Sequence, residues 1–266
     1  MDNDLLQDQT LDLAAARLRS LHVPGDPLVL VNAWDVGSAR EVVAAGAQAV
    51  GTSSAAVAAS RGEPDDNTMP IALAFGAIAR IASAVPVPVT ADVEAGYDLD
   101  ADELVGALLA AGAVGCNLED TDHRRPGHVV DVDTAATRLA EVREAADRSG
   151  VELVINARID VLIHAGADRS AALPEVVRRA HRYLEAGADC VFPLAIADPA
   201  TVERLVTDLG EPVNVGLPPG VAVSEMAAAG ASRISFGPQL QRRAMADLQQ
   251  RARELLGNGA ASRSVH

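Results

Sequence analysis

Short apolar segments alternate with longer segments of helical period along most of the chain. The apolar segments are rich in Val, Ile and Leu and have the length of buried strands: 28–33, 48–53, 87–93, 114–119, 152–158, 189–194, 212–216 and 232–236. Between them, apolar residues recur with helical spacing at 36–45, 70–84, 101–111, 133–149, 170–186, 198–209, 219–229 and 238–256. Short, continuously apolar strands that alternate with helices are typical of a parallel sheet buried on both faces.

A weak internal repeat refines this picture. The tripeptide Ala-Gly-Ala occurs at 45–47, 111–113, 186–188 and 229–231, each time between a predicted helix and a predicted strand. Glycine is common there because it adopts the left-handed conformation that ends a helix. Eight strand–helix units in a chain of this length predict an α/β fold of the (β/α)8 barrel type. A doubly wound open sheet is the alternative, which the lack of Gly-x-Gly-x-x-Gly after the first strand disfavours.

The two ends of the chain are predicted to lie outside the eight strand–helix units. Residues 1–21 have the pattern of an extra N-terminal helix, and we expect a single barrel domain over 1–257. The segment 258–266 is expected to be a flexible tail.

Composition and charge narrow the possible functions. The formal net charge of −15 disfavours binding to nucleic acid or to anionic membranes, and aromatic residues make up only 2% of the chain. Both cysteines, Cys116 and Cys190, lie in apolar segments, as in proteins of a reducing compartment. The acidic N-terminus lacks the pattern of a signal peptide, so we expect a soluble, cytoplasmic protein.

Polar residues gather where the predicted strands end, which is the active-site face of such a barrel. The spacing i, i+2 places Asp92 with Glu94, and Arg158 with Asn156, on one face of their strands. Clustered carboxylates are unfavourable without a cation, so Asp92, Glu94 and Glu119 suggest Mg²⁺ or Mn²⁺. Arg158 would then hold a substrate carboxylate or phosphonate with its planar fork. Each acid taken alone is better explained as a solvated loop residue, and only the three together favour a metal.

Several segments, taken in order, resemble the isocitrate lyase/phosphoenolpyruvate mutase superfamily. They are VNAWDVGSAREVVAAGAQAVGTSSAAVAASRGEPD, VPVTADVEAGY, VGCNLED, INARIDV and SRISFGP. The resemblance implies a Mg²⁺-dependent barrel that makes or breaks C–C or P–C bonds beside a carboxylate, through an enolate-type intermediate. It also implies that the last helix, 238–256, is swapped between the subunits of a homo-oligomer, either a dimer or a dimer of dimers.

The resemblance also assigns roles to individual residues. Asp92, Glu94 and Glu119 correspond to the metal-binding acids, the last often through water. Asp65 corresponds to an aspartate in the loop over the site, and Arg158 to the substrate-binding arginine. The substrate-binding candidates are completed by the residues that follow other strands: Ser53, which corresponds to a serine that holds the substrate carboxylate, Ser54, Trp34 and Asn214. Trp34 is equally well a packing residue beneath the barrel mouth.

The loop after the fourth predicted strand departs from the lyase pattern. Isocitrate and methylisocitrate lyases carry Lys-(Lys/Arg)-Cys-Gly-His there, whereas this chain reads TDHRRPGHVVDVD, without the cysteine that serves as acid/base. The loop's cationic residues, His123, Arg124, Arg125 and His128, form either a lid over an anion or solvated surface charge. His128 is the candidate for proton transfer, because histidine titrates near neutral pH.

These observations predict a Mg²⁺-dependent lyase. It would cleave a C–C bond of a small 2-oxo or 2-hydroxy di- or tricarboxylate, such as an oxaloacetate-like acid, through a metal-stabilised enolate. One alternative is P–C bond chemistry on phosphonopyruvate, as a hydrolase or a mutase. Another is a metabolite-binding homologue that has lost catalysis, which the unmatched loop suggests.

Overall fold

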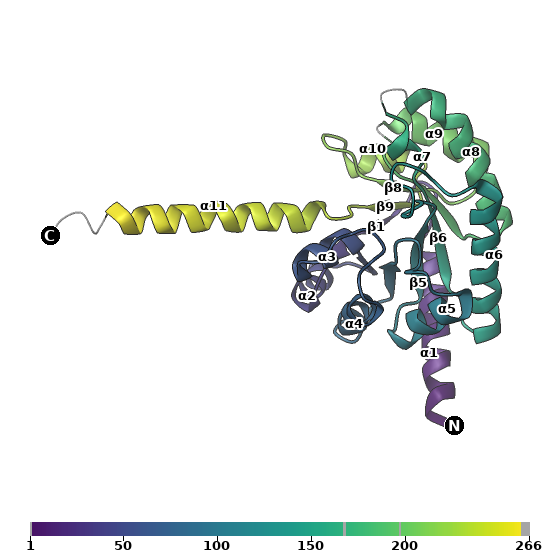
Figure 1. Ribbon diagram of the computed structural model, residues 1–266, viewed down its shortest axis with the longest axis horizontal. Coiled ribbons are helices and arrows are strands. Elements are labelled where there is room, and N and C mark those ends of the chain that lie inside the picture. The colour runs from purple at the N-terminus through teal and green to yellow at the C-terminus, as the bar shows by residue number, and fades with distance from the viewer. Residues whose placement is uncertain (1, 167–168, 197, 262–266) are drawn as a thin grey trace.

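The computed structural model describes residues 2–166, 169–196 and 198–261, with side chains described within 10–257 (Figure 1). Every predicted strand segment contains an observed strand. The strands are β1 Leu28–Leu30, β2 Asn32–Ala33, β3 Val50–Thr52, β4 Val89–Asp92, β5 Gly115–Glu119, β6 Val154–Ile159, β7 Cys190–Pro193, β8 Asn214–Gly216 and β9 Arg233–Ser235.

The strand pairings run round a ring. All are parallel, in the orders β1-β9-β8 and β2-β3-β4-β5-β6-β7. Only Val31 separates β1 from β2, and a parallel bridge between Val191 and Val213 joins the β7 and β8 sides. This α/β arrangement is compatible with a (β/α)8 barrel and differs from an open doubly wound sheet.

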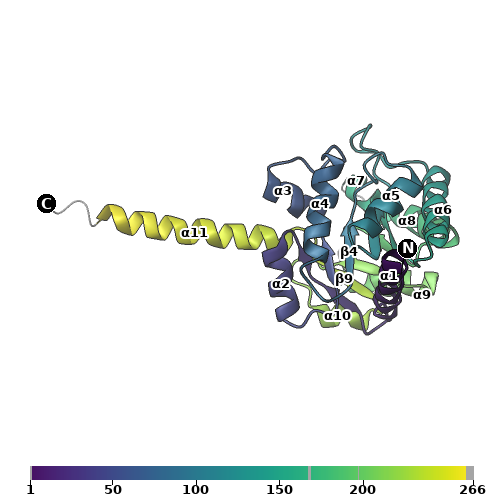
Figure 2. The ribbon, with the colours of Figure 1, turned by 90° about the horizontal axis from the view of Figure 1, so that it is seen from below.

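Helices surround the strands, as Figures 1 and 2 show. Those that overlap predicted helical segments are α1 Asp2–Ser20, α2 Val36–Ala44, α4 Ile71–Ala82, α5 Ala101–Ala110, α6 Val132–Ser149, α8 Arg169–Glu185, α9 Pro199–Leu209, α10 Val223–Ala228 and α11 Gln239–Ala261. Two short helices, α3 Ser54–Arg61 and α7 Val161–His164, follow strand ends and were not predicted. No described helix is long and apolar enough to cross a membrane.

Helix α1 packs against the end of the barrel where the strands begin. Ala15 and Leu18 are fully buried in a cluster with Leu28 and Val154, the first residues of β1 and β6. Gly115, which begins β5, fits closely here, because a Cβ on it would lie 2.8 Å from Leu18 Cδ2. Helix α1 therefore covers the end of the barrel opposite the strand ends that carry the predicted site.

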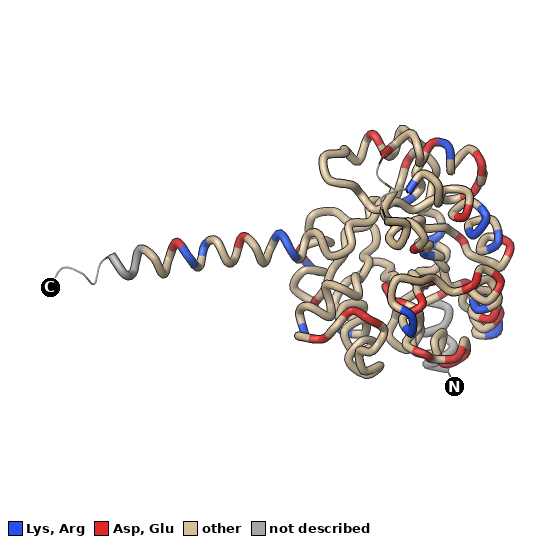
Figure 3. The backbone as a smooth tube through the Cα atoms, turned by 45° about the horizontal axis from the view of Figure 1, so that its top comes forward, with Lys and Arg blue, Asp and Glu red and all other residues tan. Residues whose placement is uncertain are grey.

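Helix α11 projects away from the barrel in both ribbon views (Figures 1 and 2). Its side chains Leu248, Leu255 and Leu256 are 60%, 75% and 76% exposed. Figure 3 shows acidic and basic residues interspersed along it. The helix continues to Ala261, past the expected domain end at 257, and the rest of the predicted tail, 262–266, lies outside the described residues.

Candidate active site

Asp92 ends strand β4 and is fixed through one of its two carboxylate oxygens. The backbone N–H and the hydroxyl of Ser54 donate to Asp92 Oδ2 at 3.2 and 3.1 Å. The backbone N–H of Asp92 donates to Thr52 Oγ1 at 3.0 Å. Asp92 Oδ1 is buried and has no hydrogen-bond partner among the described residues. Ser54, predicted to bind substrate, thus holds an acid of the site.

Ser53 begins helix α3 as its N-cap. Its side chain is buried and accepts a hydrogen bond from the backbone N–H of Ala56 at 3.4 Å, and Gly62 ends the helix in a left-handed conformation. Ser and Thr are favoured at N-caps because their oxygen satisfies a free N–H of the first turn. A bond of 3.4 Å is weak, so the Ser53 hydroxyl keeps capacity to bind a ligand.

Glu94 presents a second buried carboxylate beside Asp92. It is 2% exposed, and its backbone has a left-handed φ of 51°. The backbone N–H of Asn67 donates to Oε2, whereas Oε1 has no partner within the described part of the chain. Burial, followed by the nearby charge of Asp65, raises the pKa of Glu94 to about 7.

Glu119, the last residue of β5, is engaged by two cationic groups. His123 Nε2 lies 2.7 Å from Oε1, and Arg158 Nη1 lies 2.5 Å from Oε2. Burial raises the pKa of Glu119, against the opposite effect of Arg158. The hydrogen bond to Glu119 raises the pKa of His123, which favours its charged form.

The three predicted metal acids do not form a ready-made ligand set. No group of three His, Cys, Asp or Glu side chains in the described ranges is placed to hold a metal ion. Glu119 instead faces Arg158, and carboxylates repel one another unless a cation lies between them. The unpartnered oxygens Asp92 Oδ1 and Glu94 Oε1 are nevertheless buried, and hard divalent cations prefer such oxygen ligands. These two oxygens therefore fit Mg²⁺ or Mn²⁺, whereas Glu119 is paired with His123 and Arg158.

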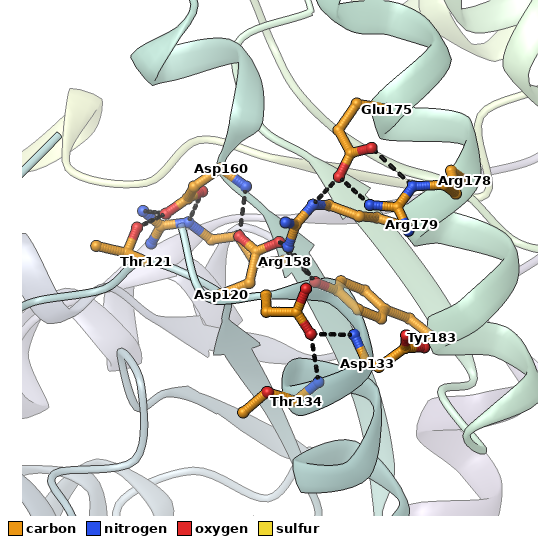
Figure 4. Close-up of polar contacts among 11 residues, drawn as sticks. Asp120, Thr121, Asp133, Thr134, Arg158, Asp160, Glu175, Arg178, Arg179 and Tyr183 are labelled. Atoms are coloured by element: carbon orange, nitrogen blue, oxygen red, sulfur yellow. Dashed lines mark hydrogen bonds and ion pairs between the residues drawn. The ribbon is translucent and has the colours of Figure 1, made fainter. Parts of the chain in front are cut away.

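Arg158 differs most from its predicted state. Its Nε and Nη2 bind Asp160 Oδ1 and Oδ2 at 2.7 and 2.8 Å, so a carboxylate of the chain already occupies the planar fork (Figure 4). Burial alone would lower the pKa of Arg158, but Glu119 and Asp160 raise it overall. A ligand can therefore meet only the remaining N–H groups of Arg158, not the bidentate edge that the sequence suggested.

A buried network supports Asp160 from behind (Figure 4). Thr121 Oγ1 donates to Asp160 Oδ2 at 2.5 Å, and the Asp160 backbone N–H donates to Asp120 Oδ1 at 2.9 Å. From helix α8, Arg179 Nη1 and the Tyr183 hydroxyl donate to Asp120 Oδ2 at 2.9 and 2.7 Å. Sequence reasoning gave none of these residues a role, because their contacts span separate elements.

Asp65 lies close to the site. Partial burial raises the pKa of Asp65, and the neighbouring groups that act on this pKa include Ser54, Asp92 and Arg158. Asp65 therefore lies near Asp92 at the end of β4, and its role in the site stays a prediction.

Three other candidates lie in different surroundings. His128 is exposed, and its Nδ1 is 3.2 Å from the carbonyl oxygen of Pro126. The histidine of this loop that contacts Glu119 is His123. Trp34 is half-buried and packs against the main core. Asn214 is fully buried, and its Oδ1 accepts a hydrogen bond from Ser235 Oγ at 3.0 Å. The substrate roles of Trp34 and Asn214 and the catalytic role of His128 stay predictions.

A fully buried cation, Arg233, lies inside the barrel. Its Nη2 donates to Asn117 Oδ1 at 3.0 Å, and Asn156 Nδ2 donates to the same oxygen at 2.8 Å. Burial lowers the pKa of Arg233 to about 10. Asn117 pairs in register with Asp92, so this polar interior lies beside the end of β4.

A cavity of about 610 Å³ lies beside Glu119. His123 and Arg158 line one part of it, and Leu99, Leu118 and Leu139 contribute an apolar part. Small-molecule sites typically combine such a concave, partly apolar wall with a few polar groups.

The geometry can be compared with known proteins. Residues 18–256 match the family model described as phosphoenolpyruvate phosphomutase. The chain belongs to the phosphoenolpyruvate phosphomutase family. Across 82% of this chain and 80% of the relative, it is 32% identical to an uncharacterised protein of Mycobacterium tuberculosis. It is 29% identical to 2-methylisocitrate lyase of Escherichia coli, over 73% of this chain and 70% of that enzyme.

Solved structures of the phosphomutase family agree with the fold. A protein of Burkholderia cenocepacia provisionally named a phosphonomutase has a TM-score of 0.86 and 41% identity, over 90% of this chain and 99% of that one. The predicted superfamily is therefore confirmed, and with it the expectation of an enzyme of the isocitrate lyase/phosphoenolpyruvate mutase type.

Proposed function

We propose that the protein is a Mg²⁺-dependent lyase that cleaves a C–C bond of a small 2-oxo or 2-hydroxy di- or tricarboxylate. The observation that carries the proposal is the pair of buried oxygens without hydrogen-bond partners in the described structure, Asp92 Oδ1 and Glu94 Oε1. A bound divalent cation would supply Lewis-acid stabilisation of the negative charge that develops on the 2-oxo oxygen.

The side chains around these oxygens have separable roles. Ser54 and Thr52 keep Asp92 in place, which leaves Oδ1 free. The Ser53 hydroxyl and the outer N–H groups of Arg158 would bind a substrate carboxylate, while the loop with Asp65 covers it. His123, whose pKa is raised by Glu119, is better placed than His128 to hold a proton beside the site.

P–C bond chemistry on phosphonopyruvate is the second candidate. It is favoured by the 41% identity to the B. cenocepacia protein provisionally named a phosphonomutase. The loop without the lyase cysteine also argues against isocitrate or methylisocitrate as substrate. A protein that only binds metabolites is disfavoured, because Asp92, Glu94 and Arg158 are all present at the strand ends.

We further propose that helix α11 is swapped between subunits of a dimer or a dimer of dimers. The exposed Leu248, Leu255 and Leu256 lie on a helix that projects from its own barrel (Figure 1). An apolar helix face without cover is unfavourable in water, and a neighbouring subunit would cover it.

A substrate panel with a metal control tests the proposed reaction. Oxaloacetate-like 2-oxo acids, 2-hydroxy acids and phosphonopyruvate are incubated with Mg²⁺, and pyruvate and other products are measured. We expect one acid to be consumed, and Mg²⁺ or Mn²⁺ to raise the melting temperature by mass action. Asp92→Asn should abolish most of both effects. A melting temperature that metal leaves unchanged in the wild type would contradict the proposal, and binding without turnover would favour the non-catalytic alternative.

A further inference from the structure

We propose that Asn67 is a positioning residue that orients Glu94 and ties the loop carrying Asp65 to it. The inference rests on the proposed function, because it takes Glu94 as a metal-binding acid. Asn67 follows Asp65 by two positions in the loop between helices α3 and α4. Nothing in the residue pattern pointed to it, since it lies outside every strand.

Asn67 makes two contacts with the segment that carries Glu94. Its backbone N–H donates to Glu94 Oε2. Its side-chain Oδ1 accepts a hydrogen bond from the backbone N–H of Tyr97 at 2.9 Å. One residue therefore holds both the carboxylate and the turn that follows it.

That turn has an unusual backbone. Glu94, Tyr97 and Asp98 have left-handed φ values of 51°, 53° and 57°. Such values are uncommon for residues other than glycine and persist where surrounding contacts maintain them. The Tyr97 ring packs edge-on against Phe75, with centroids 6.0 Å apart, and Arg138 Nη2 donates to the Leu99 carbonyl oxygen at 2.6 Å. Asn67 supplies the contact from the side of the Asp65 loop.

The consequence concerns the free oxygen of Glu94. With Oε2 held by Asn67, the carboxylate cannot rotate freely, and Oε1 stays buried and available. Asn67 is itself left-handed, with a φ of 63°. Asparagine tolerates this conformation, but glycine tolerates it better. Position 67 could require only the left-handed backbone, or it could also require the side-chain contact with Tyr97. Glycine keeps the backbone conformation and loses the contact, so replacement by glycine separates these two explanations.

The test measures Mn²⁺ affinity, by electron paramagnetic resonance of the full-length protein without substrate. Asn67→Gly keeps the backbone N–H and the left-handed bend but loses the contact with Tyr97. We expect its Kd for Mn²⁺ to rise about 3- to 10-fold, as for the loss of one hydrogen bond. Asn67→Asp keeps the acceptor and adds a negative charge beside the acids, so it should not raise the Kd for Mn²⁺. Thr68→Ala, which removes a hydroxyl contact with Asp66 in the same loop, is the matched control and should leave Kd unchanged.

Two outcomes overturn the assignment in distinguishable ways. If Asn67→Gly binds Mn²⁺ as tightly as the wild type, the residue serves only the bend. If the wild type binds no Mn²⁺, the proposed function itself fails, and the role of Asn67 fails with it. A purely structural role would lower the melting temperature of Asn67→Gly equally with and without Mn²⁺. The positioning role predicts that the stabilisation by Mn²⁺ also shrinks, beyond the fall in melting temperature that is seen without metal.

Discussion

Arg158 shows how a neighbouring side chain changes which ligands a residue can bind. An arginine at a strand end predicts a substrate fork, yet Asp160, two residues later, takes both Nε and Nη2. Asp160 is fully buried, so an uncompensated charge there would be costly. The pair is therefore a unit in which the carboxylate sets the orientation of the guanidinium, and a ligand meets a cation already fixed in place.

Replacing Arg158 by lysine should consequently damage both stability and activity. Lysine keeps a charge but cannot bind Asp160 through two parallel contacts. We expect the free energy of unfolding in urea to fall by about 2–3 kcal/mol, and turnover of the acid found in the panel to fall roughly 10²-fold. Arg178→Lys is the control, because Arg178 makes a similar two-point contact with Glu175 on the surface, where its loss should cost under about 1 kcal/mol. Wild-type turnover in Arg158→Lys would place the substrate elsewhere.

His22 follows helix α1 and gives the protein a defined sensitivity to acid. It is 9% exposed, and its Nδ1 lies 2.9 Å from the Leu18 carbonyl oxygen. Burial, followed by the charge of Arg233, lowers the pKa of His22 to about 4. The unfolded chain, with a histidine pKa near 6.5, binds more protons than the folded chain between these two values. The contribution of neutral His22 to the free energy of unfolding is therefore full above pH 6.5, and it is lost as the pH falls toward 4.

The His22→Gln variant should remove this loss, because glutamine does not titrate. Between pH 6.5 and 4.5, we expect the free energy of unfolding of the wild type to fall by about 2 kcal/mol more than that of the variant. Urea unfolding at a series of pH values, followed by circular dichroism, measures the difference. Parallel pH profiles would show that His22 is not buried in its neutral form.

At the scale of elements, the buried strands were the most predictable part. The segment 152–158 holds the apolar run Leu153 to Ile155, because both faces of a barrel strand are covered. Helix α3 was missed because its eight residues, SAAVAASR, are short and carry no amphipathic pattern long enough to recognise. Its ends are marked only by the cap Ser53 and by Gly62. Local capping, rather than periodicity, defines this helix.

The candidate site likewise contains residues that regular spacing predicted and residues that it could not predict. Spacing along strands brought Asp92, Glu94 and Arg158 to one end of the barrel, because strand geometry is regular. It could not find Asn67, whose contacts depend on a loop, or Arg179, which reaches Asp120 from another helix. Contacts between elements distant in sequence carry no local pattern. Spacing also gave no sign that Asp160 binds Nε and Nη2 of Arg158, because spacing gives proximity but not which partner is bound.

At the scale of the whole molecule, the projecting helix α11 predicts that the protein assembles into an oligomer. Leu248→Glu combined with Leu255→Glu places charge on the exposed apolar side chains of the helix. We expect the wild type to be an oligomer by light scattering after size exclusion, and the double variant to be a monomer with an unchanged circular dichroism spectrum. Gln249→Glu adds one charge on the same helix and should leave the oligomer intact. A monomeric wild type, or an oligomeric double variant, would contradict the swap.

Helix α1 also affects how a ligand enters and leaves the barrel. Because Leu18 and its neighbours fill the end where the strands begin, a ligand at the opposite end does not enter or leave past helix α1. The proposed cleavage would form two fragments there, and the fragment bound deeper would leave after the outer one. Under the proposed reaction, release would therefore follow depth, and the fragment that leaves last would compete directly with the next substrate molecule.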